Sequence, residues 1–255
     1  MKREKKKISV AIQGVRGSFH EMAAIEYFRD CEISIVPCDT FSDLFRVLVE
    51  GSADFGIVAF ENSVAGSILP NYELLRKSRL PVTGEVCLRV IQNLVALPGQ
   101  KLSDIREVHS HPMAIQQCSH FVDELRQQGV KVVEAVDTAL SARIISDGQQ
   151  YGSGAIASKS AAELYSLSVL RQEIEDDSLN FTRFLIICGN SGPGCVNTGG
   201  AGRENENSRD PGTGSRTAGC YDRENENHSD PGTGSRTGRN PGQAGGTDKA
   251  MVCFS

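Results

Sequence analysis

The sequence has 255 residues and a formal net charge of -5 at pH 7. That length allows one large domain or two small ones, and the negative charge argues against a nucleic-acid partner. Apolar runs such as 55–60 are far too short to cross a bilayer. The run at 8–12, behind a basic N-terminus, is too short for a secretion signal. We therefore expect no membrane association and no leader sequence.

The eight cysteines show neither CxxC pairing nor metal-ligand spacing. Cys87, Cys118 and Cys188 lie in apolar stretches of the sequence. Free cysteines of this kind behave as small apolar residues, and disulfides are rare in the cytoplasm. The pattern favours reduced thiols, no metal site and a cytoplasmic location.

Strand-like and helix-like segments alternate as far as about Gly189. Apolar and β-branched runs predict strands over 8–12, 33–37, 55–60, 82–90, 93–97, 107–110, 131–135, 155–157 and 182–188. Capping signals and apolar periodicity predict helices over 18–28, 40–50, 112–128, 139–145 and 159–165. This alternation is typical of an α/β fold whose sheets are covered on both faces.

The predicted elements form two sets, with long strands over 82–90 and 93–97 that could cross between them. We predict two α/β lobes within 8–190, divided near 81–90. A ligand cleft is expected between the lobes, near the carboxyl ends of strands.

The composition changes between residues 191 and 246, where Gly, Pro, Asn and Arg dominate. The stretch 203–217 (RENENSRDPGTGSRT) recurs almost unchanged at 223–237. A segment with so few apolar residues cannot bury enough surface to offset its ordering entropy. We therefore predict a disordered linker, which would form the C-terminal tail together with residues 247–255.

Polar residues follow several predicted strands. Asn62 and Ser63 come directly after the apolar run at 55–60, where they can bind a small polar ligand or form a turn and helix cap. Ser110 and His111 stand at another strand-to-helix junction. His111 could act as a base or metal ligand, but no second ligand is spaced to support it, so a capping or positioning role is preferred.

Two further positions continue this pattern. Gln117 lies about two turns along the predicted helix, facing either a cleft or the surface. Thr138 begins a helix, for which ordinary N-capping is the alternative to ligand binding. Helices that begin near Ser18, Ser110 and Thr138 would together favour an anion.

The segment NFTRF at 180–184 opens the last predicted strand. Alternate side chains of a strand point to opposite faces. Thr182 and Phe184 therefore share one face, and Arg183 takes the other. A hydroxyl, a fixed cation and an aromatic ring at this place suit the edge of a cleft.

These motifs together make the region 8–190 resemble prephenate dehydratase. The matching stretches, in order, are GVRGSF at 14–19, FENS at 60–63, SHPMAIQQC at 110–118, DTA at 137–139, AIAS at 155–158 and NFTRF at 180–184. Six motifs in family-like order and spacing are far more specific than any one of them.

The resemblance implies a cofactor-free lyase without a metal, which converts prephenate to phenylpyruvate, water and CO2 in phenylalanine biosynthesis. It implies two lobes of the type II periplasmic-binding-protein kind and a homodimer. Thr182 is then the catalytic residue at the leaving hydroxyl, and Arg183 binds a substrate carboxylate unless it forms a salt bridge that fixes the strand. The remaining substrate-binding residues implied are Asn62, Ser63, Ser110, His111, Gln117, Thr138 and Phe184.

Members of this family often carry a C-terminal ACT domain that binds phenylalanine. Residues 247–255 (TDKAMVCFS) resemble the first strand of such a domain. We expect no allosteric site from this remnant, because a lone strand cannot form that fold.

Two other functions remain open from the sequence. One is arogenate dehydratase, whose substrate carries an amino group in place of the keto group of prephenate. The other is a non-catalytic sensor of small carboxylates, for which the hydroxyl of Thr182 has no evident use.

Overall fold

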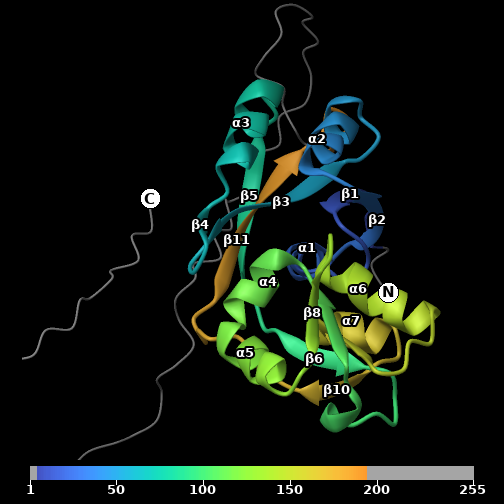
Figure 1. Cartoon of the computed structure of the whole chain (residues 1–255). Coiled ribbons are helices and arrows are strands. Elements are labelled where there is room, and N and C mark those ends of the chain that lie inside the picture. The colour runs from blue at the N-terminus through green and yellow to red at the C-terminus, as the bar shows by residue number, and fades with distance from the viewer. Residues whose placement is uncertain (1–4, 194–255) are drawn as a thin grey trace, which may run out of the picture. The chain divides into compact units, whose positions relative to one another are not determined.

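The computed structural model describes residues 5–193, which form two α/β lobes (Figure 1). This confirms the predicted two-lobed α/β fold class. The predicted linker from residue 194 onward and the ACT-like stretch 247–255 lie outside the described residues.

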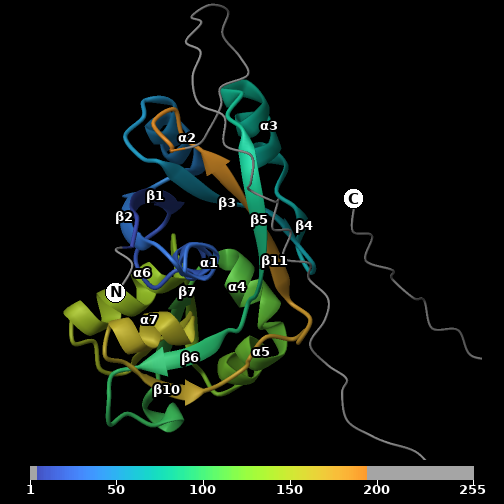
Figure 2. The same cartoon turned by 180° about the vertical axis from the view of Figure 1, so that it is seen from behind.

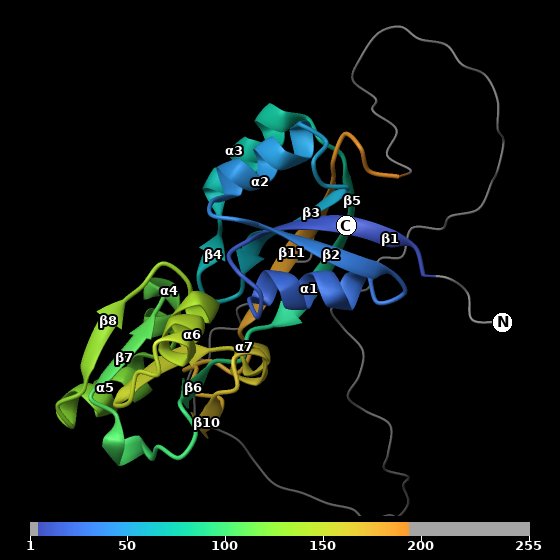
Figure 3. The ribbon, with the colours of Figure 1, turned by 90° about the vertical axis from the view of Figure 1, so that its right-hand side faces the viewer.

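The first lobe is built on a sheet with strand order β2-β1-β3-β11-β5, to which the short β4 is added beside β3. Strands β1 and β2 and strands β1 and β3 are parallel, whereas β11 runs antiparallel to both β3 and β5. Helix α1 covers one face of the sheet, and α2 and α3 cover the other (Figure 3). The elements are β1 (Lys7–Gln13), α1 (Phe19–Tyr27), β2 (Glu32–Cys38), α2 (Phe41–Val49), β3 (Phe55–Asn62), β4 (Gly66–Ser67), α3 (Leu69–Ser78), β5 (Val82–Arg89) and β11 (Phe181–Cys188).

The second lobe has a sheet with strand order β10-β6-β9-β7-β8. One apolar cluster packs this sheet against α4 and α5, and a second packs it against α6 and α7. The elements are β6 (Asn93–Ala96), a 3-10 turn (Leu102–Asp104), β7 (Glu107–Ser110), α4 (Pro112–Gln117), α5 (Ser119–Gln127), β8 (Lys131–Glu134), α6 (Thr138–Asp147), β9 (Ser153–Ala157), α7 (Lys159–Leu164) and β10 (Ser168–Arg171).

The chain passes between the lobes twice, through residues 90–92 and 172–180. Strand β5 ends in the first sheet and β6 begins in the second, as the view from behind shows (Figure 2). The strands predicted over 82–90 and 93–97 therefore each belong to one lobe, and the short irregular segments between strands make the crossing. The antiparallel β11 brings the chain back and places 180–188 in the centre of the first lobe.

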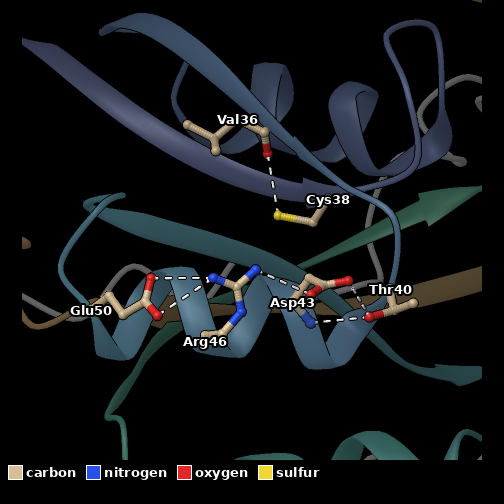
Figure 4. A network of polar contacts seen from close by, with 6 residues as sticks. All are labelled: Val36, Cys38, Thr40, Asp43, Arg46 and Glu50. Carbon is tan, nitrogen blue, oxygen red and sulfur yellow. Dashed lines mark hydrogen bonds and ion pairs between the residues drawn. The ribbon is translucent and has the colours of Figure 1, made fainter.

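Helix α2 shows how local sequence fixes an element. The Thr40 hydroxyl accepts a hydrogen bond from the backbone N–H of Asp43, and Arg46 lies between the carboxylates of Asp43 and Glu50 (Figure 4). The cap satisfies a backbone donor that has no partner within the helix. The opposite stripe, with Leu44 and Leu48 fully buried, packs on the sheet.

The helix predicted over 112–128 is two helices in the structure, which corrects that prediction. Cys118, buried and with φ -117° and ψ 32°, separates α4 from α5. The carboxylate of Asp176 accepts hydrogen bonds from the backbone N–H groups of Ser119 and His120 at 2.8 and 3.0 Å. Asp176 thus caps α5 from a distant part of the chain, an interaction that no local pattern could indicate.

A β-bulge interrupts the pairing of β3 with β11. Arg183 pairs with Glu61 and Phe184 with Ala59, so Phe60 is the additional residue. Phe60 is buried in the cluster beneath α2 and α3, and Glu61 accepts a hydrogen bond from the Tyr72 hydroxyl on that same side. Two successive residues therefore face α3, and the alternation resumes with Asn62 on the opposite face.

The five cysteines within 5–193 divide into two groups. Cys31, Cys38 and Cys118 are free thiols, whereas Cys87 and Cys188 are disulfide-bonded. The expectation of reduced thiols is therefore wrong for these two residues. Within 5–193, every helix is too short or too polar to cross a membrane.

Candidate active site

A cavity of about 480 Å³ lies between the two lobes. The first lobe contributes the start of α1 and one face of β3 and β11, and the second contributes the starts of α4 and α6. Its polar lining includes Gln13, Ser18, His20, Asn62, Ser67, Gln92, His111, Gln117, Asp137, Thr138 and Thr182.

Thr182 lies on β11 directly opposite Asn62 of β3, and its side chain faces the cavity. The Thr182 Oγ1 accepts a hydrogen bond from the Asn62 Nδ2 at 2.9 Å. No residue of the described region accepts the Thr182 hydroxyl proton. Because a hydroxyl can accept and donate at once, that proton is free to be donated to a molecule in the cavity.

Three amides surround this hydroxyl. Asn62 Nδ2 also donates to Asn180 Oδ1 at 2.7 Å, and Asn180 Nδ2 donates to Gln117 Oε1 at 3.0 Å. Gln117 belongs to α4 of the second lobe, so the cluster connects the two walls of the cavity. These contacts fix the side chains around Thr182 before any ligand binds.

His20 and Phe184 form an aromatic wall. Their ring centroids are 5.1 Å apart in an edge-to-face arrangement, and Phe41 lies 5.5 Å from His20 on the other side. Removal of the ring from water lowers the pKa of His20 from 6.5 to about 4. His20 is therefore a neutral imidazole at pH 7, suited to donating or accepting a hydrogen bond rather than to holding an anion by charge.

Two polar atoms of cavity-lining residues lack partners within the described residues. They are His20 Nε2 and Gln92 Oε1, both inaccessible to water. Buried polar groups are normally hydrogen-bonded. Both residues line the cavity, so a small shift of either side chain would bring its unpartnered atom within reach of a ligand there.

The charge of the lining is low. Among the described lining residues, Asp137 is the one Asp, Glu, Lys or Arg. Its Oδ1 caps α6 by accepting from Leu140 N at 2.7 Å, and burial raises the pKa of its carboxyl. An anionic ligand would therefore be held by neutral donors and by the start of α1, where backbone N–H groups and the helix dipole favour negative charge, because the carboxyl group of Asp137 already occupies the start of α6.

Within 5–193, no group of three or more His, Cys, Asp or Glu side chains is arranged to hold a metal ion. His111 instead caps α4, since its Nδ1 accepts from Met113 N at 3.1 Å.

Residues 10–191 match the family model of prephenate dehydratase. The chain belongs to the prephenate dehydratase family. An arogenate dehydratase/prephenate dehydratase of Arabidopsis thaliana is 41% identical over 181 residues, which cover 71% of this chain and 45% of the relative. Arogenate dehydratase 2 of Petunia hybrida is 43% identical over 188 residues, which cover 73% of this chain and 46% of the relative. The match thus spans less than half of each plant protein.

Solved structures agree with this membership. The prephenate dehydratase of Arthrobacter aurescens, solved in complex with L-Phe, has a TM-score of 0.64 at 28% identity over 74% of this chain and 62% of that one. A protein described as a quorum-quenching acylase has a TM-score of 0.62 at 33% identity over 71% of this chain and 64% of that one.

The cavity between the lobes is lined by six of the nine side chains that the sequence analysis predicted as catalytic or substrate-binding residues. Thr182, Phe184 and Asn62 line it from the first lobe, and His111, Gln117 and Thr138 from the second. They come from four motifs that are far apart in the sequence, so the fold assembles them into one site.

Three of the nine side chains do not line the cavity. Ser63 Oγ donates to the Leu179 carbonyl at 2.6 Å, and the buried Ser110 Oγ donates to the Ile156 carbonyl at 2.8 Å. Arg183 lies on the opposite face of β11, where it pairs with Glu85 and Glu61. These contacts give the three side chains structural partners, and for Arg183 they favour the strand-fixing salt bridge; substrate binding by the three stays a prediction.

The sequence interpretation missed His20 and Gln92. His20 belongs to the stretch SFHE at 18–21, which was interpreted only as a capping signal at the start of a helix. That interpretation gave no reason to place His20 in a cavity. Gln92 follows β5 in the irregular segment between the lobes, where no periodicity applies. Only the structure identifies them, because each has a buried polar atom without a hydrogen-bond partner among the described residues.

Proposed function

We propose that this chain catalyses the decarboxylating dehydration of prephenate to phenylpyruvate in phenylalanine biosynthesis, without a cofactor. The observation that carries this proposal is the Thr182 hydroxyl, which accepts from Asn62 and keeps its own proton for the cavity. A group arranged in this way is a hydrogen-bond donor aimed at a leaving oxygen.

The chemistry requires few protein groups. The bond between the ring and its carboxylate breaks, and the electron pair moves into the ring. The carbon–oxygen bond across the ring then breaks, which leaves an aromatic product, CO2 and hydroxide. Thr182 donates to that departing oxygen, and a proton from solvent completes the water. A threonine hydroxyl is too weak an acid to supply the proton itself at neutral pH, so its role is to stabilise developing charge.

The cavity supports the remaining requirements. Phe184 and His20, packed edge to face, provide an aromatic wall for the ring. The start of α1, which lines the same cavity, provides backbone donors for a carboxylate. The protein thereby orients the substrate, and aromatisation of the ring supplies the driving force.

Arogenate is the second candidate substrate, and Asp137 favours it. Arogenate carries an ammonium group where prephenate carries a keto group, and Asp137 is the one formally charged side chain in the described lining. An ion-paired hydrogen bond to a carboxylate is worth about 1.5–3 kcal/mol. Similarity to proteins named arogenate dehydratases agrees with this possibility.

The similarity to a quorum-quenching acylase does not suggest a third activity. Acyl transfer by a hydroxyl requires a base that accepts the hydroxyl proton. Thr182 instead receives a hydrogen bond from the Asn62 amide, and an amide N–H cannot act as a base.

The full chain should be assayed with each substrate separately. Prephenate should yield phenylpyruvate, followed by its enolate absorbance, and arogenate should yield phenylalanine, followed by chromatography. Turnover of neither substrate, together with measurable binding of either, would support the sensor alternative and refute the enzyme.

Substitution Asp137→Asn distinguishes the two substrates. Asparagine keeps the cap of α6 but removes the charge. If arogenate is the preferred substrate, its kcat/KM should fall about 10-fold or more while that for prephenate changes little. Equal effects on both substrates would remove Asp137 as an ammonium-binding residue.

A homodimer belongs to this proposal as an implication of family membership, and a cytoplasmic location is proposed from the free thiols of Cys31, Cys38 and Cys118. Sedimentation of the full chain tests the first, and localisation of a tagged chain in its native cells tests the second.

A further inference from the structure

Asn180 is the most completely buried amide at the junction of the two lobes. It immediately precedes β11, is 1% exposed, and does not line the cavity. Its side chain accepts from Asn62 of the first lobe and donates to Gln117 of the second. It therefore lies behind the site, between the two walls, without access to substrate.

The orientation of every amide in this cluster is determined. Asn62 Oδ1 accepts from the backbone N–H groups of Val64 and Ala65 at 3.0 and 2.8 Å. A backbone N–H can only donate, so the Asn62 nitrogen must point the other way, toward Asn180 and Thr182. Asn180 must then accept through its oxygen, and its nitrogen must donate to Gln117.

This chain of hydrogen bonds sets the direction in which the Thr182 hydroxyl donates its proton. The Asn62 nitrogen has two N–H groups. One goes to Asn180 Oδ1 at 2.7 Å, which leaves the other for Thr182 Oγ1 at 2.9 Å and for the more distant Phe181 carbonyl at 3.2 Å. Without the Asn180 acceptor, the Asn62 amide would keep the bonds to its oxygen but lose the shortest contact of its nitrogen, so the N–H group that serves Thr182 would be held less firmly.

We propose that Asn180 is a positioning residue, which holds Asn62 so that Thr182 must donate its hydroxyl proton into the cavity. The proposal rests on the proposed function, because it concerns the step that Thr182 stabilises. Since Gln117 belongs to the second lobe, the same bonds make the orientation of the hydroxyl dependent on the position of that lobe.

The backbone of Asn180 has a separate role. Its carbonyl accepts from Val90 N at 2.7 Å and so joins the two crossing segments. Substitution of the side chain leaves this bond in place, and a loss of activity can therefore be assigned to the amide group.

The test is a double-mutant cycle in the full chain, with Asn180→Ala, Thr182→Val and the combined variant. Loss of a positioned group near the reacting atoms should lower kcat about 10- to 100-fold in Asn180→Ala, with KM changed less than about threefold. In the Thr182→Val background the same substitution should change kcat by less than about twofold, because the hydroxyl that it positions is absent.

Asn71→Ala is the matched control. Asn71 is fully buried on α3, on the far side of the sheet, and donates to the Ala59 carbonyl at 2.7 Å. It should lower thermal stability by an amount similar to Asn180→Ala while kcat stays within about twofold of the wild type. If Asn180→Ala does not fold, Asn180→Ser takes its place, since serine cannot span from Asn62 to Gln117.

The outcomes separate the two proposals. A wild-type chain that turns over neither substrate contradicts the proposed function. A wild-type chain that is active, combined with equal losses of kcat from Asn180→Ala in both backgrounds, overturns the positioning role and leaves the function intact. A loss confined to KM overturns it as well.

Discussion

The side chains of Asn62 and Thr182 are joined by a hydrogen bond of 2.9 Å, although 120 residues separate them in the sequence. The pairing of β3 with β11 sets them opposite each other, and the bulge at Phe60 turns Asn62 toward the cavity. The residue that carries the proposed chemistry and the residue that orients it therefore depend on the same local departure from strand geometry.

Thr182→Val should abolish most turnover while the fold is kept. Valine has a similar shape but no hydroxyl, so the donor to the leaving oxygen is lost. Removal of one such donor typically lowers kcat about 10²- to 10³-fold. Steady-state kinetics with Thr182→Ser as the control, which retains the hydroxyl, measures the effect. Near-wild-type turnover in the valine variant would exclude Thr182 from the mechanism.

Arg183→Lys should affect stability more than catalysis. The guanidinium pairs with Glu85 and Glu61 on the face of β11 away from the cavity. Partly exposed ion pairs contribute about 1 kcal/mol or less, and lysine cannot reproduce the two-sided contact. We expect a small decrease in the free energy of unfolding, measured in urea, with KM unchanged within about twofold. A large rise in KM would restore Arg183 as a substrate-binding residue.

His20 should make the protein less stable in mild acid. Its pKa is about 4 in the folded chain, against an ordinary value of 6.5 for an exposed histidine. Between these values the unfolded chain binds more protons, so stability falls as the pH decreases through this window. The loss should be on the order of 3 kcal/mol at pH 4.

His20→Phe provides the comparison, because it keeps the aromatic contacts with Phe184 and Phe41. Urea unfolding at pH 7 and pH 4.5 should show a smaller pH dependence for the variant. Parallel behaviour of the two proteins would mean that His20 titrates normally.

Gly17→Ala should disturb the contact between the lobes. Gly17 has φ +86°, and a Cβ there would lie 2.9 Å from the Cα of Ala161 in the second lobe. Side chains rarely adopt this backbone conformation, and such strain costs about 1–3 kcal/mol. We expect a lower unfolding midpoint and a raised KM. Gly99→Ala is the control, since it also has positive φ but no atom near the added Cβ; equal effects would assign the change to backbone strain alone.

Much of the architecture follows from the sequence alone. The apolar runs and capping residues indicated every strand of the described region except β4 and β10, and every α-helix except α3. They could do so because burial periodicity and local capping act over a few residues. The motif around Thr182 was equally local: strand alternation put Thr182 and Phe184 on one face and Arg183 on the other, as the structure has it.

Tertiary structure decided the rest. Regular alternation along β3 would have placed Asn62 on the same face as Phe60. The β-bulge in the pairing of β3 with β11 places Asn62 on the opposite face instead. The cap of α5 by Asp176, the burial of Ser110 and the bond from Asn180 to Gln117 each join residues that are distant along the chain. Local propensity contains no information on which distant polar group will satisfy a buried donor, and so the composition of this site became definite only when the two lobes were packed together.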